Sequence, residues 1–204
     1  MRLFSYKLHS DTGFAPNPFW GVLTLATCKP QIRKSKRAGD WIAGFTSNSL
    51  CGDHVGEERL LYLMQITDKL PIAQYFLHPD FQYKIPDLTR EEFVYQAGDN
   101  IYKQQDHDFL QIPNRNHIEN DTRHDVSGEF VLVSTWFYYF GISPIKIPEN
   151  VRPAIPRGQS AHGSLTHDNE RASMFVTFVM EHYQIGVHDR PHTWPNNDVS
   201  WRSH

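Results

Sequence analysis

The chain has 204 residues, of which 39% are hydrophobic and 21% charged, a balance typical of a globular domain and not of a disordered segment. Its formal net charge of -3 excludes a uniformly basic nucleic-acid-binding protein, so any phosphate site must be local. The two cysteines, Cys28 and Cys51, exclude a disulfide-rich scaffold. With no hydrophobic signal region and no long apolar stretch, the sequence predicts a cytoplasmic protein without a membrane partner.

The first third of the chain predicts strands, since its apolar runs are short and rich in β-branched residues. These strands are expected at 2–8, 20–28, 40–45 and 59–67. The turn-forming residues between the last two predict a hairpin loop. Short helices are expected at 71–77, where a proline occupies the first helical position, and at 89–96, where Thr89 and Glu92 fit a capping box.

The second half begins with a polar region, 98–125, that predicts loops and two short strands. Residues 128–142 predict the longest strand of the chain, and the Pro-rich segment that follows predicts extended loop. One long helix is expected at 166–186, with Thr166 or Asp168 as its cap and an apolar stripe that packs on the sheet.

These elements predict an α+β fold: a curled, mostly antiparallel sheet or small β-barrel with a few short helices and one long C-terminal helix. A parallel βαβ alternation is not visible. We expect a single domain at 1–186, followed by a polar C-terminal tail at 187–204.

The first candidate binding residues lie in the N-terminal loop and the basic run behind it. Asn17 is held between two prolines, and its amide can read the edge of a nucleobase or form an Asx turn. Lys29 and Arg33 belong to a run of five positive charges that suits phosphate, although such a run is also typical of a solvated loop.

Aromatic residues supply a second set of candidates. Asp40 opens a strand through a Gly-Asp turn and Trp41 begins it, while Trp20 begins the earlier strand expected at 20–28. The aromatic side chains at 136–139 alternate between the two faces of the longest strand. Such rings can stack on bases, or they can fill the core on both faces.

The polar middle concentrates side chains suited to acid–base chemistry or to a divalent metal. They are Asp99, Asp106, His107, Asp108, Asn114, His117, Asp121, His124 and Asp125. Their spacing matches no metal-binding motif, so a solvated loop is the alternative, and no cofactor can be named. No Gly-rich phosphate loop, nucleophile elbow or Cys–His nucleophile arrangement is recognisable. His162 precedes the long helix, where an anion site or a capping loop is expected.

Five segments resemble the second nucleotide-modification-associated domain family of bacterial and phage proteins. They are SDTGFAPNPFWGVLTLATCKPQIR, GDWIAGF, RLLYLMQIT, AGDNIY and VLVSTWFYYFG, and the likeness runs over residues 2 to about 185. The resemblance implies a link to modified nucleotides or DNA bases without a proven reaction. The family's polar positions would be carried by Asp11, Thr12, Asn17, Lys29, Asp40, Asp99, Asn100, Asn114 and His117. A second, shorter similarity to PUA-like barrels covers about 40 residues from AGDWIAGF onward.

Two readings of the function follow. As an enzyme on a nucleotide or base, the protein would use Asp99, His117 and Asp11 for catalysis. The base and phosphate would be held by the other candidates, which are Asn17, Trp20, Lys29, Arg33, Asp40, Trp41, Asn100, Asn114 and His162. As a reader, it would bind a modified base or free nucleotide without chemistry. A weaker third reading is a protein-interaction domain that docks through its tail. The oligomeric state stays open.

Overall fold

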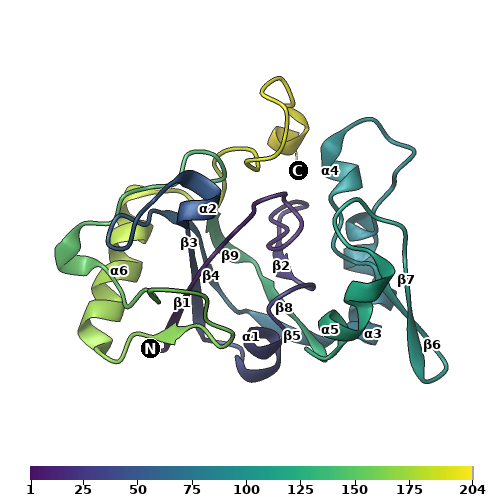
Figure 1. The fold of residues 1–204 in the computed structure, drawn as a ribbon, viewed down its shortest axis with the longest axis horizontal. Helices are drawn as coiled ribbons and strands as arrows, with labels where there is room; N and C mark the ends of the chain where they lie inside the picture. The colour runs from purple at the N-terminus through teal and green to yellow at the C-terminus, as the bar shows by residue number, and fades with distance from the viewer. Residues whose placement is uncertain (204) are drawn as a thin grey trace.

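The computed structural model describes residues 1–203, and Figure 1 shows strands of two sheets at its centre with helices around them. The strands are β1 (Leu3–Lys7), β2 (Leu23–Leu25), β3 (Trp41–Phe45), β4 (Leu60–Gln65), β5 (Asp68–Pro71), β6 (Tyr102–Gln105), β7 (Asp108–Gln111), β8 (Phe130–Ser134), β9 (Trp136–Tyr139), β10 (Ser164–Leu165) and β11 (Gly186–Val187). The α-helices are α1 (Pro30–Ser35), α2 (Asn48–Cys51), α3 (Ile72–Leu77), α4 (Phe93–Gln96), α5 (Thr122–Val126) and α6 (Asn169–His182). Short 3-10 helices lie at η1 (Pro79–Lys84), η2 (Glu119–Asp121), η3 (Glu149–Val151) and η4 (Ser200–Ser203).

The larger sheet has the strand order β10-β1-β3-β4-β9-β11, and the smaller has the order β2-β8-β5. A separate hairpin joins β6 to β7. Most neighbours are antiparallel, but β9 pairs with β11, and β1 with β3, in parallel. A parallel pair needs a long crossover connection, and here the crossover contains β2 and α1. This crossover therefore carries Cys28 out of the larger sheet.

The prediction of one long strand at 128–142 is wrong, because the chain changes sheets at Thr135. Strand β8 pairs with β2 and β5, whereas β9 pairs with β4 in the larger sheet. The larger sheet ends at β10 and β11, which do not pair with each other, so the sheets do not close into a barrel. The fold is α+β as expected, but the barrel alternative is wrong and the PUA-like similarity finds no support.

Two apolar clusters hold these layers together. Helix α6 packs Ala172, Phe175 and Val179 against one face of the larger sheet, as the apolar stripe predicted. On the opposite face, side chains such as Ile42 and Met64 meet Leu132 of the smaller sheet. The aromatic residues of β9 supply both clusters, with Tyr138 in the first and Phe137 and Tyr139 in the second.

Several local predictions differ from the structure in detail. Helix α6 is shorter than predicted and begins after Asp168, whose carboxylate accepts from two backbone N–H groups of the first turn. The predicted hairpin loop between β3 and β4 contains α2. The C-terminal segment adds β11 to the larger sheet and buries Trp194, which is 4% exposed, while His204 lies outside the described residues. Among residues 1–203, no helix has both the length and the apolar character needed to span a bilayer.

Candidate functional site

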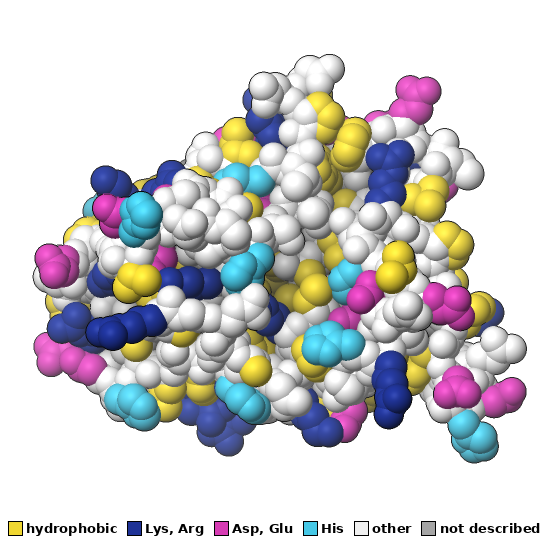
Figure 2. Space-filling model, viewed as in Figure 1, with side chains coloured by type: hydrophobic (Ala, Val, Ile, Leu, Met, Phe, Trp, Pro, Cys, Tyr) yellow, Lys and Arg dark blue, Asp and Glu magenta, His cyan; other side chains and the backbone are white. Residues whose placement is uncertain are grey.

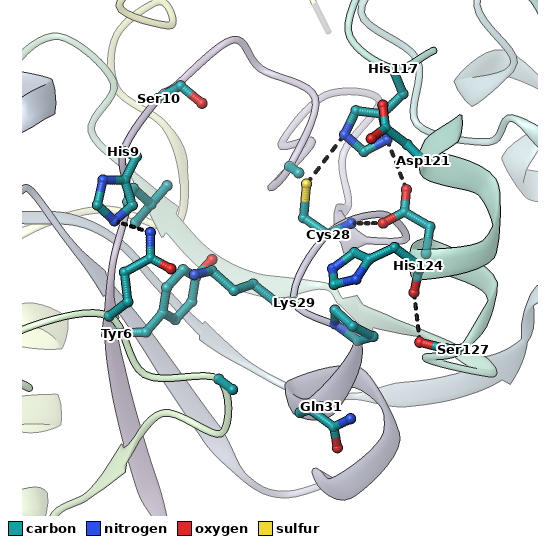
Figure 3. Close-up of a pocket in the computed structure, with 16 residues that line it drawn as sticks. Tyr6, His9, Ser10, Cys28, Lys29, Gln31, His117, Asp121, His124 and Ser127 are labelled. Atoms are coloured by element: carbon teal, nitrogen blue, oxygen red, sulfur yellow. Dashed lines mark hydrogen bonds and ion pairs between the residues drawn. The ribbon is translucent and has the colours of Figure 1, made fainter. Parts of the chain in front are cut away.

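A cavity of about 480 Å³ opens where the crossover after β1 faces α5 and the loop before it. Figure 2 shows the corresponding hollow at the centre of the front face, with histidine and acidic side chains gathered on its α5 side. Polar and titratable residues from both sides line the cavity, and Figure 3 shows how they lie. The volume is within the range of small-molecule sites.

Cys28 stands on the cavity wall in a strained backbone turn. Strand β2 ends three residues before it, and α1 begins two residues after it with Pro30. Cys28 has φ 53° and Lys29 has φ 40°, a conformation that L-residues with side chains adopt rarely. A tight turn between a strand and a helix lifts the side chain of its central residue out of the backbone layer, so the sulfur is presented to the cavity.

His117 lies beside the sulfur, with 3.4 Å between Cys28 Sγ and His117 Nε2. The loop after β7 holds the histidine, because the Asn114 side chain accepts from the backbone N–H of His117 and Gln111 donates to its carbonyl. Burial alone would lower the pKa of His117, but Asp125 and Cys28 together raise it to about 10. The imidazole is therefore charged near neutral pH.

Asp125 completes the arrangement on α5. Its carboxylate is fully buried, lies 2.8 Å from His117 Nδ1, and accepts from the Tyr102 hydroxyl and from the backbone N–H of Cys28. Burial would raise the pKa of this carboxyl, but its contacts with His117 and Tyr102 and the charge of Arg33 outweigh that effect and lower the pKa. A charged carboxylate at this position fixes the orientation of the histidine ring.

Arg33 connects the turn that carries Cys28 to helix α5, which carries Asp125. Its guanidinium is fully buried and donates to the carbonyls of Cys28, Asp125 and Phe130. The chain passes close to it at Gly128, where a Cβ would lie 2.6 Å from the guanidinium carbon. Arg33 thus sets the carbonyl of the strained Cys28 turn and the end of α5 relative to each other.

The resulting Cys–His–Asp geometry is suited to covalent catalysis. A thiolate is a strong nucleophile, a neighbouring imidazolium attracts it and can later give a proton to a leaving group, and a carboxylate orients that imidazolium. From the sequence, His117 was a candidate and Asp125 belonged to the polar cluster, but no partner cysteine was recognisable. Cys28 and His117 are 89 residues apart in the sequence, so no spacing could connect them.

A second Cys–His–Asp array lies elsewhere in the fold. Cys51 Sγ is 3.2 Å from His192 Nε2, and His192 Nδ1 is 2.9 Å from the buried carboxylate of Asp11. Asp11 also accepts from the Tyr139 hydroxyl. Neither Cys51 nor His192 lines the cavity of Cys28. The predicted residue Asp11 therefore belongs to this second array and not to the array of His117.

Three other predicted residues belong to a buried polar network behind β2. Asp99 accepts from the hydroxyls of Thr24 and Tyr75, and Asn17 accepts from the buried Lys84 ammonium. Asn100 donates to two backbone carbonyls, one of them of Tyr75. Asp99, Asn17 and Asn100 are each at most 1% exposed and do not line the cavity. Their contacts join the N-terminal loop to the segment around η1.

The remaining candidates are spread over the molecule. Asp40 is buried and paired with Arg2, and Trp41 lies in the core cluster under α6. Trp20 stacks on Tyr83 at a centroid distance of 5.3 Å, and His162 is exposed outside the cavity. Of the predicted binding residues, Lys29 lines the cavity, while Arg33 and Asn114 support its wall from behind. Within residues 1–203, no group of three or more His, Cys, Asp or Glu side chains is arranged to hold a metal ion.

Comparison with known proteins adds one match. No curated protein and no solved structure matches the chain. The model of one family, described as nucleotide modification associated domain 2, matches residues 1–198, and this description indicates an association with nucleotide modification without specifying a reaction. Since the match covers nearly the whole sequence, the chain belongs to the nucleotide modification associated domain 2 family.

Proposed function

We propose that the protein is a cysteine-dependent enzyme that acts on a nucleotide, or on a base, in nucleotide modification. The observation that carries the proposal is the alignment of Cys28, His117 and Asp125 on the wall of an open cavity. The family assignment supports the nucleotide as the substrate class.

In the proposed reaction, the Cys28 thiolate attacks an electrophilic carbon of the substrate, such as that of an amide or amidine. A carbon–sulfur bond forms. The His117 imidazolium then gives its proton to the departing amine as the carbon–nitrogen bond breaks. Water then attacks the covalent intermediate, His117 takes one of its protons, and the sulfur leaves as thiolate. Asp125 keeps Nε2 of the ring directed at the sulfur throughout.

The experiment incubates the native protein with nucleotides and modified nucleosides, and then examines both partners. Intact-protein mass spectrometry detects an adduct on Cys28, and chromatography detects a changed ligand. We expect turnover with the native protein and with Cys51→Ala, and none with Cys28→Ala. Turnover that persists in Cys28→Ala overturns the proposal. A ligand that binds the native protein tightly and is recovered unchanged would favour the non-catalytic reader.

A further inference from the structure

Two residues that line the cavity, Lys29 and Tyr6, take no part in the reaction proposed for Cys28. The Lys29 side chain crosses the cavity toward Tyr6 of β1, as Figure 3 shows, and its ammonium lies 4.9 Å from the centre of the Tyr6 ring. Tyr6 lies in β1, and Lys29 lies in the crossover connection, just before α1.

The Lys29 ammonium has no carboxylate partner among the described residues. It is half-buried, and this burial lowers the pKa of Lys29, with Cys28 the one group that counters the effect by its charge. A cation partly removed from water without a carboxylate partner is costly, and a bound anion would relieve that cost.

Tyr6 adds a buried donor at the same place. Its side chain is 1% exposed, and its hydroxyl oxygen accepts from Tyr62 at 2.7 Å. Among residues 1–203, the Tyr6 hydroxyl has no recorded hydrogen-bond partner other than Tyr62, which donates to it. Burial also raises the pKa of Tyr6, which keeps this hydrogen in place. A buried hydroxyl normally finds a partner for its hydrogen, and a ligand in the cavity would supply one.

The carboxylates of the cavity lie on a different wall from Lys29. The two carboxylates on its lining, Asp121 and Asp125, stand on the wall of His117, as Figure 3 shows for Asp121. Lys29 and Tyr6 offer donors and positive charge only. A ligand that bridges the cavity would therefore place an acceptor or negative charge against Lys29 and its reactive carbon against Cys28.

We propose that Lys29 and Tyr6 form a subsite for an anionic group of the substrate, a phosphate or a carboxylate. The inference rests on the proposed function, in which this cavity holds the substrate. It narrows the substrate class to an anionic small molecule, such as a nucleoside monophosphate or a nucleoside whose base bears a carboxylate. A neutral nucleoside would bind weakly.

Two alkylating reagents of similar size test this subsite without knowledge of the substrate. Iodoacetate is anionic and iodoacetamide is neutral, and both modify a thiolate. The rates at Cys28 are measured in a Cys51→Ala background, and their ratio is divided by the ratio for the same chain unfolded in urea. We expect a corrected preference for iodoacetate of about tenfold, the scale of one nearby charge in a partly buried site.

Three variants identify the groups responsible. Lys29→Met should bring the corrected preference to about 1, whereas Lys29→Arg, which keeps the charge, should retain most of it. Tyr6→Phe keeps the ring and should lower the preference by about threefold, the effect of one modest hydrogen bond. Lys103→Met removes an exposed lysine outside the cavity and serves as the matched control for net charge. The charge of His117 is common to all these variants.

The kind of anion that the subsite prefers is identified by which anion protects Cys28 from iodoacetamide. Inorganic phosphate that slows the iodoacetamide reaction in the parent but not in Lys29→Met identifies a phosphate subsite, and acetate that does so identifies a carboxylate subsite. A corrected preference that does not change in Lys29→Met overturns the subsite. Its failure is separate from that of the proposed function, since turnover can still depend on Cys28 when the preference is unchanged.

Discussion

The two cysteines of this chain have nearly the same partners in two different settings. Each sulfur lies within 3.4 Å of a histidine Nε2, and each histidine Nδ1 lies within 2.9 Å of a buried aspartate that also accepts from a tyrosine hydroxyl. The Cys28 array borders an open cavity, and neither Cys51 nor His192 lines that cavity. In the proposed function the same three residue types serve two purposes, and the cavity distinguishes the catalytic array from the other.

The Cys51 array holds the C-terminal segment in place. Asp11 accepts from both the backbone and the ring of His192, and its own carbonyl accepts from the backbone of Thr193. The indole of Trp194 donates to the neighbouring carbonyl of Thr12. Burial raises the pKa of the Cys51 thiol, which disfavours the nucleophilic thiolate. These contacts connect the C-terminal segment to the loop after β1.

The largest expected effect is the difference in turnover between a Cys28 variant and a Cys51 variant. Cys28→Ser should reduce turnover by at least about a thousandfold, since the hydroxyl of serine is a far weaker nucleophile beside this histidine. Cys51→Ser is the matched variant and should keep turnover within about twofold. The rate of product formation at saturating substrate is the measurement. Equal losses in both variants would remove the distinction between the arrays.

The next comparison is between Asp125 and Asp11, the aspartates of the two arrays. Asp125→Asn should slow turnover by about a hundredfold to ten-thousandfold, because an amide can hold the wrong tautomer of His117. Asp11→Asn alters the corresponding position in the other array and should affect the stability of the fold more than the rate. Rates and urea unfolding are measured on both variants. A rate loss in Asp11→Asn as large as that in Asp125→Asn would contradict the account.

The next prediction concerns the effect of Arg33 on stability. The Cys51 array has no counterpart of this residue. Arg33→Lys removes the planar donors that reach three main-chain carbonyls and should lower the free energy of unfolding by about 2–4 kcal/mol. Urea unfolding measures this change. Lys34→Met on the exposed side of α1 is the control and should change the free energy by less than about 0.5 kcal/mol. A loss in Arg33→Lys no larger than in this control would contradict the role of Arg33.

The raised pKa of His117 predicts how stability depends on pH. The folded state holds the proton more tightly than the unfolded chain, so its stabilising effect is complete below about pH 6.5 and is lost as the pH rises through about 10. The difference in unfolding free energy between the native protein and His117→Asn should shrink over this interval. Urea unfolding at pH 6 and pH 10.5 measures it, and a difference that stays constant would contradict the charged state of His117.

The smallest effect concerns the C-terminal segment. His192→Ala should cost about 1 kcal/mol and increase hydrogen exchange in the residues after β11, because their connection to Asp11 is lost. Turnover should be unaffected. Unchanged exchange in this segment would show that Trp194 and the neighbouring contacts hold it without His192.

Much of the fold could be predicted from local sequence. The stripe that includes Ala172 and Phe175 predicted the packing of α6, and the apolar runs predicted β1, β3 and β4 within a few residues. The break at Thr135 could not be predicted, since the residues on both sides favour strands equally and only the pairing partners differ. Barrel closure is likewise a property of strand pairing over long distances, not of any one segment.

The candidate site was only partly predictable for the same reason. Lys29, His117 and Arg33 were identified by residue type, and each lies at the cavity or directly behind its wall. Asp99 and Asn17 have the same polar character, yet they lie in a buried network around Lys84. Polarity in a sequence does not distinguish a group that faces a ligand from one that satisfies a buried neighbour. The signal that could have pointed to Cys28 is its position between a strand and Pro30.

The most direct test of the difference between the two arrays is the alkylation rate of each cysteine in the native protein. Iodoacetamide at neutral pH, followed residue by residue with peptide mass spectrometry, reports the thiolate reactivity of both sulfur atoms in one sample. We predict that Cys28 reacts at least about a hundredfold faster than Cys51, and that His117→Asn removes most of this advantage without changing the rate at Cys51. Equal rates at the two cysteines, or a Cys28 rate that does not depend on His117, would contradict this prediction.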